Sequence, residues 1–378
     1  MSVTNVIPVL MDIGSDTCKV GFSGDQNPRN IVPSVVGHRQ TVQSVGVDTV
    51  KRNCIGQDAL DEGDALTLKY PIERGVITDW ENMEILWDYI YQKKLTALPT
   101  DHPVLVTDTP NNPKENREKM AEILFEKFNV PAFFSSCQAV LCLYSAGRCT
   151  GLVLDVGSDV TSAVPVYEGY SLSESIVRTN FAGKDITQYL LGLLSDRGFQ
   201  FTTASEKSHV KIMKEKLCYV SQDFDKDMTE FSKSSHSAGA TYQLPDGKTI
   251  SLGTERFKGP ELLFQPSISE KNETKGIHEM INKAILACEL DTRKSLYTNV
   301  ILSGGGSLFD GIVERLKKEL KSFGTLGAEA RVHAPKDRIL SAWTGGSVLT
   351  SLPFFEKNWI SRKDYQESGP QVVNTRCF

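Results

Sequence analysis

Two short acidic segments of the sequence are nearly identical and could bind a phosphate group together with a metal ion. Residues 12–17 read DIGSDT, and residues 155–160 read DVGSDV. Glycine and small polar residues let successive backbone N–H groups converge on an anion. A carboxylate before each turn, Asp12 or Asp155, suits the water shell of Mg²⁺, which takes few direct protein ligands. The pair therefore predicts a metal–phosphate site, whereas one copy alone would be an ordinary polar turn.

The residues around each acidic segment predict a β-hairpin. Hydrophobic runs at 9–11 and 152–154 come before the two turns, and strand-like segments at 18–22 and 163–167 follow them. Each unit thus has two apolar strands joined by a polar turn. We expect two similar half-domains that present similar turns.

A third glycine-rich stretch has the order strand, turn, helix. We expect a strand at 300–303, a turn at Gly304–Gly306 and a helix at 311–320 with Ile312, Leu316 and Leu320 on its inner face. This order brings backbone close to a nucleotide, although a tight turn packed under a helix is the alternative. The stretch does not match G-x-G-x-x-G, because its last position is Phe309.

One segment resembles a phosphate-binding motif but does not meet its requirements. Gly247-Lys248-Thr249 resembles the end of a P-loop, but Tyr242 occupies the position of the required first glycine. We expect residues 244–247 to form a hairpin turn instead.

Strands alternate with helices along the rest of the chain, which predicts an α/β architecture with central sheets. We expect a strand at 102–107 and a buried helix at 138–143. Four helices are predicted from caps and apolar stripes. The first helix is capped by Asp79 and has Met83, Leu86, Tyr89 and Ile90 on one face. The second has Asn112 as N-cap, Pro113 at N1 and Glu115 at N3, followed by an apolar stripe of Met120, Ile123, Leu124 and Phe128. The third follows residues 182–185 and contains Leu190, Leu191 and Leu194, and the fourth begins at Ser205 and contains Val210, Met213, Lys214 and Leu217.

Two segments are interpreted from their polarity. Residues 38–54 are polar without a sustained period and predict an exposed loop, which is either solvated surface or a partner-binding loop. The region from 182 to about 272 is predicted to be an inserted, helix-rich lobe.

Composition excludes several classes of function. A net charge of −5 over 378 residues gives no general attraction to nucleic acid or anionic membranes. The eight cysteines form no C-x-x-C pair and indicate free thiols of a reducing compartment. The longest apolar run, 139–144, is too short to cross a bilayer. The histidines lack helical zinc spacing. These features predict a cytosolic or nuclear protein.

Taken together, the motifs resemble actin over essentially the whole chain. Besides the two hairpins and the glycine stretch, the resemblance rests on the segments 68–73 (LKYPIE), 116–120 (NREKM), 214–219 (KEKLCY), 343–347 (WTGGS), 367–370 (ESGP) and 376–378 (RCF). The chain looks like a divergent actin or an actin-related protein.

The resemblance implies the two-lobed fold of the sugar-kinase, Hsp70 and actin superfamily, with duplicated ribonuclease-H-like half-domains around a nucleotide cleft. The implied parts are an outer large subdomain (1–33, 71–145 and 341–378), a small mobile subdomain (34–70), an inner large subdomain (146–181 and 273–340) and an inner small subdomain (182–272).

The resemblance also implies a bound ATP or ADP with Mg²⁺, or Ca²⁺ in vitro. Asp12 and Asp155 would orient metal-bound water, and Gln138 would lie near the attacking water. The first turn would hold the β-phosphate through Gly14, Ser15, Thr17 and Lys19, beside Asp16. The second turn would hold the γ-phosphate through Gly157, Ser158, Asp159 and Val160. Ribose and adenine would be surrounded by Gly183, Lys211, Lys214, Glu215, Gly305, Gly306, Leu308 and Phe309.

Three departures from actin bear on catalysis. Actins have glycine in place of Asp16, an aspartate–glycine pair in place of Ser158-Asp159, and histidine in place of Ser162. An extra carboxylate near a triphosphate would repel it by roughly 1 to 4 kcal/mol at 4 Å, unless it is neutralised or points away. Loss of a proton-relay histidine removes help worth about 10²- to 10⁴-fold. We therefore expect nucleotide binding with slow or absent hydrolysis, at most a weak Mg²⁺-dependent ATPase.

A further departure concerns assembly. Residues 268–275 are mostly charged or polar where actins carry an apolar plug that contacts neighbouring filament strands, so self-assembly should be weaker or differently arranged. A cleft that binds partners would be lined by Tyr144, Val348, Leu349 and Leu352, with ordinary core packing as the alternative.

The resemblance therefore implies a cytoskeletal protein of the cytoplasm, or of the nucleus, that forms, joins or caps actin-like filaments. The alternative is a non-polymerising subunit of a chromatin-remodelling or motor-adaptor complex with structural nucleotide. A metabolic phosphotransferase on the same fold is disfavoured, because the chain ends and the partner surfaces match actin.

Overall fold

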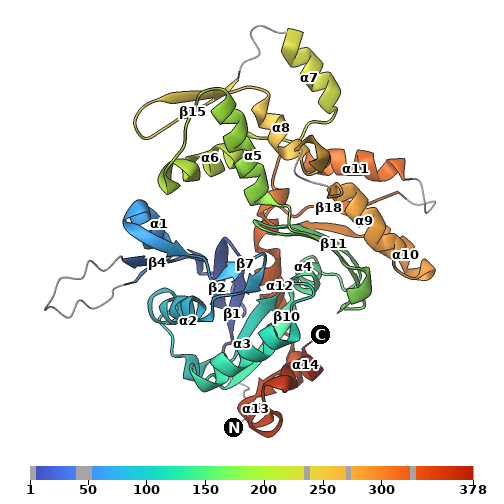
Figure 1. The fold of residues 1–378 in the computed structure, drawn as a ribbon. Coiled ribbons are helices and arrows are strands. Elements are labelled where there is room, and N and C mark those ends of the chain that lie inside the picture. The colour runs from blue at the N-terminus through green and yellow to red at the C-terminus, as the bar shows by residue number, and fades with distance from the viewer. Residues whose placement is uncertain (1–5, 40–52, 234–238, 270–273, 324–328, 378) are drawn as a thin grey trace, which may run out of the picture. The chain divides into compact units, whose positions relative to one another are not determined.

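Both acidic turns connect neighbouring strands of a sheet, as the sequence predicts. The computed structural model describes residues 6–39, 53–233, 239–269, 274–323 and 329–377. Helices and mixed sheets alternate along the chain, which confirms the α/β class (Figure 1). The chain divides into two compact units, one of Met1–Val153, Val166–Glu174 and Ile339–Phe378 and the other of Leu154–Pro165 and Ser175–Arg338. The finer division into four subdomains remains a prediction.

A six-stranded sheet forms the centre of the first unit. Its strand order is β19-β10-β9-β1-β2-β3. The strands are β1 (Val9–Ile13), β2 (Thr17–Phe22), β3 (Asn30–Pro33), β9 (Val104–Asp108), β10 (Ala132–Cys137) and β19 (Ile360–Ser361). β1, β9 and β10 are mutually parallel, and every residue of β1 and β9 is buried. Parallel strands with both faces covered read as continuous apolar runs, which is why these segments were recognisable in the sequence.

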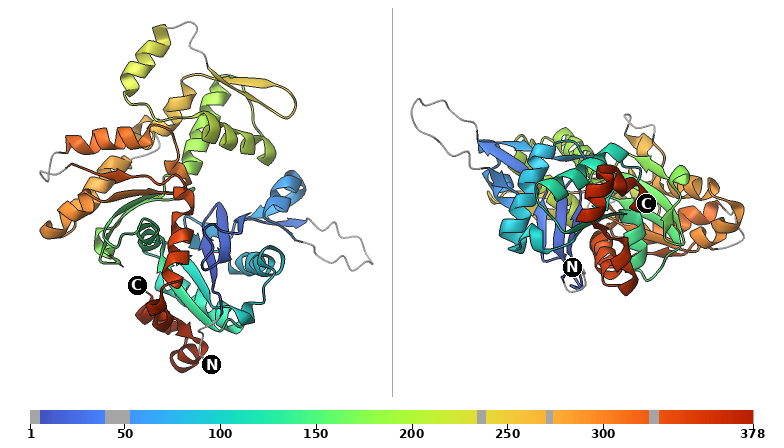
Figure 2. Two further views of the ribbon diagram at one scale, coloured as in Figure 1. Left: turned by 180° about the vertical axis from the view of Figure 1, so that it is seen from behind. Right: turned by 90° about the horizontal axis from the view of Figure 1, so that it is seen from below.

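Helices pack around this sheet. They are α2 (Trp80–Tyr89), α3 (Lys114–Glu126), α4 (Gln138–Ser145), α12 (Ser341–Thr350), α13 (Arg362–Ser368) and α14 (Val373–Arg376). Helices α4 and α12 approach so closely that a Cβ at Gly345 would lie 1.8 Å from the carbonyl oxygen of Leu141. The C-terminal helices, red in Figure 2, lie beside α3, where Tyr365 stacks on Phe125.

The structure confirms one predicted helix cap and corrects another. Asp79 caps α2 by accepting a hydrogen bond from the backbone N–H of Asn82 at 3.1 Å. Asn112 does not cap α3, which begins at Lys114 with Pro113 as its N-cap. The Asn112 amide instead donates to Asp108 and accepts from Asn116. A buried polar partner thus competes successfully for the side chain that the sequence assigns to the helix end.

Helix α6 (Ala204–Leu217) also differs slightly from its prediction. It begins one residue before Ser205, because Thr203 is the N-cap and forms a reciprocal capping box with Glu206. Val210, Met213 and Lys214 are buried as expected, while Leu217 is half-buried.

A small sheet within the first unit has a core of its own. It consists of β5 (Cys54–Ile55), β4 (Val36–Arg39) and β6 (Leu66–Lys69), next to α1 (Gln57–Glu62). Val35, Ala59 and Leu66 are buried together there. A short hairpin of β7 (Ile72–Glu73) and β8 (Val76–Ile77) follows. Most of the predicted polar loop 38–54, residues 40–52, lies outside the described residues.

A second sheet has the order β13-β12-β11-β17-β18, with β14 paired to β12. The strands are β11 (Gly151–Val156), β12 (Thr161–Tyr167), β13 (Tyr170–Ser171), β14 (Val177–Thr179), β17 (Val300–Ser303) and β18 (Val332–His333). In the second unit α9 (Ile277–Leu286) packs against β14 and α11 (Ile312–Ser322) against β18, while α10 (Leu290–Tyr297) packs against α9. Ile312, Leu316 and Leu320 are buried, which confirms the predicted inner face of α11.

The region expected to be helix-rich contains α5 (Gly183–Asp196), α6, α7 (Phe224–Lys233) and α8 (Glu255–Glu261). It also contains the hairpin of β15 (Ala240–Gln243) and β16 (Thr249–Leu252). Gly247 has φ of +86° in the turn between these strands. The P-loop-like residues are therefore part of a hairpin turn, as predicted.

No helix within the described ranges has both the length and the apolar character that spanning a membrane requires.

Candidate functional site

Asp12 lies at the end of β1, and three side chains from different elements contact its carboxylate. Only 4% of the residue is exposed. Thr107 Oγ1 and Gln138 Nε2 donate to Asp12 Oδ1 at 2.9 and 3.1 Å. Lys19 Nζ lies 3.3 Å from Oδ2, because the antiparallel register of β1 and β2 places Lys19 opposite Asp12. A buried carboxylate needs such compensation, and these contacts hold it in one orientation.

Gln138 connects this carboxylate to the turn that follows it. The residue is the first of α4, directly after β10. Its Nε2 also lies 3.3 Å from the carbonyl oxygen of Ile13. With Nε2 directed toward β1, Oε1 is the part of the amide that can accept a hydrogen bond from a water molecule.

Hydrogen bonds from outside the hairpin hold the first turn. Ser34 Oγ donates to the carbonyl of Gly14 at 2.6 Å, and Ser34 N donates to the carbonyl of Asp16 at 2.9 Å. The backbone N–H of Gly75 donates to Ser15 Oγ at 3.0 Å. The turn is therefore held in one conformation by groups far away in the sequence.

The donor set around Asp12 fits a hydrated divalent metal. Both carboxylate oxygens already have protein partners, so the group can contact a metal through bound water without leaving its network. Among the residues that the structure describes, no three histidine, cysteine or acidic side chains cluster as an all-protein metal site. The residues around Asp12 are compatible with a Mg²⁺ ion that keeps its waters and takes phosphate oxygens as ligands, and this metal remains a prediction.

The second turn is attached to the start of α5. Gly157 N donates to the Val160 carbonyl at 2.9 Å and closes the turn. The backbone N–H groups of Gly183 and Lys184 donate to the carbonyls of Gly157 and Ser158 at 3.2 and 2.8 Å. A Cβ at Gly183 would lie 3.1 Å from the Gly157 oxygen, so this close approach favours glycine.

The third glycine stretch packs directly against the second hairpin. Gly304 has φ of +82° and ψ of 154°, and a Cβ there would lie 2.3 Å from the Val156 carbonyl oxygen and 2.9 Å from Asp155 Oδ1. A Cβ at Gly306 would lie 2.6 Å from Val156 Cγ1. The two glycines let backbone from residues 304–307 lie beside the Asp155 carboxylate.

Lys214 lies in the same neighbourhood as a buried cation. Only 7% of the residue is exposed, and its Nζ donates to the Gly183 carbonyl at 2.8 Å. This contact ties α6 to the start of α5, and hence to the second turn.

A family model described as Actin matches residues 3–378. The chain belongs to the actin family. Proteins of this family generally bind a nucleotide together with a divalent metal. The whole-chain match agrees with the two units, the two acidic hairpins and the glycine stretch described above.

The structure brings the site residues predicted from the actin resemblance together in two groups, one in each unit. Around Asp12 lie Gly14, Ser15, Asp16, Thr17, Lys19 and Gln138. Around Asp155 lie Gly157, Ser158, Asp159, Val160, Gly183, Lys214, Gly305 and Gly306. Of the remaining predicted site residues, Lys211 and Glu215 lie on α6. Leu308 is 41% exposed, whereas Phe309 is only 8% exposed. The nucleotide contacts of these residues remain predictions.

Two of the three catalytic departures from actin have distinct surroundings in the second unit. Asp159 Oδ1 lies 2.7 Å from Lys184 Nζ. Ser162 is buried in β12 opposite Arg178 of β14, with 4% of the residue exposed. The serine is thus fixed within the sheet and offers no ring nitrogen for proton transfer.

Sequence reasoning did not assign roles to Thr107, Ser34 or Lys184. Thr107 and Ser34 reach the first turn only through strand pairing and tertiary contacts, so no local motif reveals them. Lys184 directly follows the predicted Gly183, and this adjacency is the one signal that the sequence offers.

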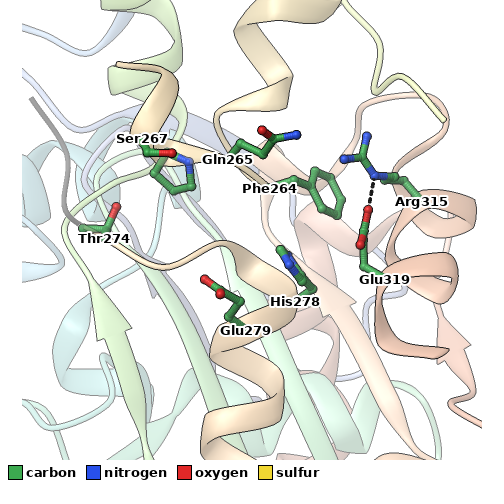
Figure 3. Close-up of a pocket in the computed structure, with 9 residues that line it drawn as sticks. Phe264, Gln265, Ser267, Thr274, His278, Glu279, Arg315 and Glu319 are labelled. Atoms are coloured by element: carbon green, nitrogen blue, oxygen red, sulfur yellow. Dashed lines mark hydrogen bonds and ion pairs between the residues drawn. The ribbon is translucent and has the colours of Figure 1, made fainter. Parts of the chain in front are cut away.

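A polar pocket of about 310 Å³ lies elsewhere in the second unit (Figure 3). Its lining residues are Phe264, Gln265, Pro266, Ser267, Thr274, His278, Glu279, Arg315 and Glu319, none of which belongs to the predicted nucleotide site. The His278 ring stacks on Phe264 and on Phe323, with 5.9 Å between centroids in each case. Burial lowers the pKa of His278, so the ring is neutral at pH 7. Among the described residues its Nδ1 has no hydrogen-bond partner.

Proposed function

We propose that this actin-family protein binds ATP or ADP with Mg²⁺, hydrolyses ATP slowly or not at all, and forms, joins or caps actin-like filaments. The observation that carries the proposal is the buried Asp12 with its partners Lys19, Thr107 and Gln138. A carboxylate and an ammonium group held side by side under a glycine-containing turn suit a metal-bound phosphate, because one faces the metal's water shell and the other is a cation for the phosphate.

The metal, when bound, would neutralise phosphate charge and polarise the transferred phosphoryl group. The chain's own residues would supply the remaining contacts. Backbone amides of the turns at 14–17 and 157–160 would donate to phosphate oxygens. Asp12 and Asp155 would orient metal-bound water, and Lys211, Lys214 and Glu215 on α6 would face the ribose and base. Calcium could replace magnesium in vitro.

Slow hydrolysis follows from the proton-transfer groups. Gln138 can orient a water through Oε1, but Ser162 replaces the histidine that actins carry near that water. General acid–base catalysis contributes about 10²- to 10⁴-fold, so its loss should leave a bound but long-lived ATP.

Surface features support contacts with other proteins. Val348 on α12 is 42% exposed and Leu352, two residues after the end of α12, is 36% exposed. Tyr144 on α4, the helix that packs against α12, is half-buried. Leu349 is only 7% exposed and belongs to the core. We propose that the three accessible side chains contact actin-like protomers or actin-binding proteins, whereas Leu349 supports them from below.

The nucleotide proposal is tested by binding of Mg-ATP to the purified protein and to a Lys19→Met variant. The Coulomb interaction lost is roughly 1 to 4 kcal/mol at 4 Å, so the Kd should rise by about fivefold or more. A Lys317→Met variant, at an exposed position of α11, should bind as the unmodified protein does. Equal affinity of all three proteins would refute the role of Lys19.

The hydrolysis proposal is tested by single-turnover measurements. The unmodified protein should turn over bound ATP far more slowly than conventional actin, and Ser162→His should increase the rate by about tenfold or more if the relay is what is missing. A rate equal to that of actin in the unmodified protein would refute the proposal.

A non-polymerising subunit of a larger complex, such as a chromatin-remodelling or motor-adaptor complex, is the second candidate, and the segment 268–275 favours it. This segment is mostly charged or polar in sequence; residues 270–273 lie outside the described residues. Negative-stain imaging with ATP and with ADP, together with pelleting after addition of Mg²⁺ and salt, separates the candidates. Filaments support the first; monodisperse protein under all conditions supports the second.

A further inference from the structure

The second turn carries a negative charge whose partner lies on a neighbouring helix. Asp159 is at the tip of the turn between β11 and β12, and its side chain is 12% exposed. Lys184 Nζ, on α5, lies 2.7 Å from Asp159 Oδ1. The lysine side chain is 51% exposed, so it reaches from the surface to a largely buried carboxylate.

Lys184 is also held by its backbone. Its N–H donates to the carbonyl of Ser158, the residue before Asp159, at 2.8 Å. The preceding Gly183 donates in the same way to Gly157. Main chain and side chain of Lys184 thus contact two successive residues of the turn, which restricts where its charge can lie.

An uncompensated carboxylate at this position would oppose the proposed function. A charge with so little access to water is stabilised only by a close partner. If Asp159 stayed ionised without Lys184, it would repel a phosphate bound at the same turn. The ion pair with Lys184 offsets this repulsion.

We propose that Lys184 is a positioning residue for nucleotide, because it neutralises Asp159 and so makes the second turn compatible with phosphate. This inference rests on the proposed nucleotide binding. Lys184 acts through Asp159 and through the turn backbone, and it need not contact the phosphate.

A double-mutant cycle tests this role. Dissociation constants for Mg-ATP and for adenosine, which has no phosphate, are measured for the unmodified protein, Lys184→Met, Asp159→Asn and the double variant. Lys317→Met controls for loss of an exposed lysine, and thermal unfolding reports whether each variant folds.

Lys184→Met should weaken Mg-ATP binding by about tenfold or more and leave adenosine binding unchanged, because only phosphate meets the negative charge that Lys184 no longer offsets. The double variant should bind Mg-ATP within about threefold of the unmodified protein, because neither charge remains. Asp159→Asn alone should bind at least as tightly as the unmodified protein.

Two results would overturn the inference while the proposed function stands. One is tight Mg-ATP binding by Lys184→Met. The other is a double variant that binds as weakly as Lys184→Met, since the lysine would then contact phosphate directly or hold α5 for another reason. Failure of the unmodified protein to bind Mg-ATP would overturn the proposed function and this inference together.

Discussion

Replacing Gly304 by alanine should damage both stability and nucleotide binding, because two separate costs meet at this residue. Its backbone angles, φ +82° and ψ 154°, belong to a region that is essentially restricted to glycine, which costs roughly 1–3 kcal/mol for another residue. The added Cβ would also lie 2.3 Å from the Val156 carbonyl oxygen. Forcing an extra carbon into such a packed place typically costs about 1–3 kcal/mol more. We therefore expect a loss of roughly 2–6 kcal/mol in the free energy of unfolding.

The affected atoms belong to the proposed site, so the variant that still folds should bind Mg-ATP more weakly. The new methyl group can be accommodated only if the end of β11 or the segment that carries residue 304 moves, and Asp155 Oδ1 lies 2.9 Å from the same position. Urea unfolding measures the stability loss, and competition with a fluorescent nucleotide measures the affinity.

Gly247→Ala is the matched control for this experiment. Gly247 has a similar φ of +86°, but an added Cβ would meet nothing within 4 Å. It should lose only the backbone cost, about 1–2 kcal/mol, and keep its nucleotide affinity. Equal losses of stability in the two variants, or unchanged Mg-ATP affinity in Gly304→Ala, would refute the steric reasoning.

Two further predictions concern the buried polar groups of the second unit. Arg315→Met should lower the free energy of unfolding by about 3–5 kcal/mol, because it leaves Glu261, which has no exposed surface, without the guanidinium that contacts both its oxygens. The double variant Glu261→Met/Arg315→Met should be less destabilised than Arg315→Met in urea; an equal or larger loss would contradict this account. Acid should destabilise the protein partly through His278, whose folded pKa lies below its ordinary value of 6.5 because burial disfavours the charged ring. The neutral His278 ring makes its full contribution to stability above the pKa of histidine in the unfolded chain, and this contribution is lost as the pH falls through that pKa. The His278→Gln variant should therefore lose less stability than the unmodified protein between pH 7.5 and about 5.5. Glu279 on α9 and Arg315 and Glu319 on α11 also face the ring and are unchanged in this variant, so parallel pH profiles would contradict the assignment.

Local patterns in the sequence predict elements whose stability depends on their own residues. Both hairpins, the strand and helix around Gly304–Gly306, and the Asp79 cap agree with the structure. Their signals are apolar runs, glycine at positive φ and a capping oxygen, all of which act within a few residues. Asn112 fails as a cap because its side chain binds Asp108 and Asn116 instead. That competition depends on tertiary burial, which the cap pattern does not contain.

The residues of the candidate site likewise fall into those that a local sequence pattern predicts and those that only tertiary contacts reveal. Asp12, Asp155 and the turn glycines are visible in sequence because they recur in the same strand context. Thr107 and Ser34 are not, since they reach the first turn through contacts that span 95 and 20 residues of chain. Strand register and long-range packing select these partners, so only a structure reveals them.

The departures from actin differ in whether a neighbour can compensate for them. A negative charge at Asp159 can be neutralised from outside, and Lys184 at 2.7 Å is placed to do so. A missing imidazole at Ser162 cannot be supplied in the same way, because a proton relay requires a group with a pKa near neutrality at one location. Binding depends on the summed charge around the phosphate, whereas proton transfer depends on one atom. On the proposed function, a chain with both departures is therefore expected to bind ATP and to hydrolyse it slowly or not at all.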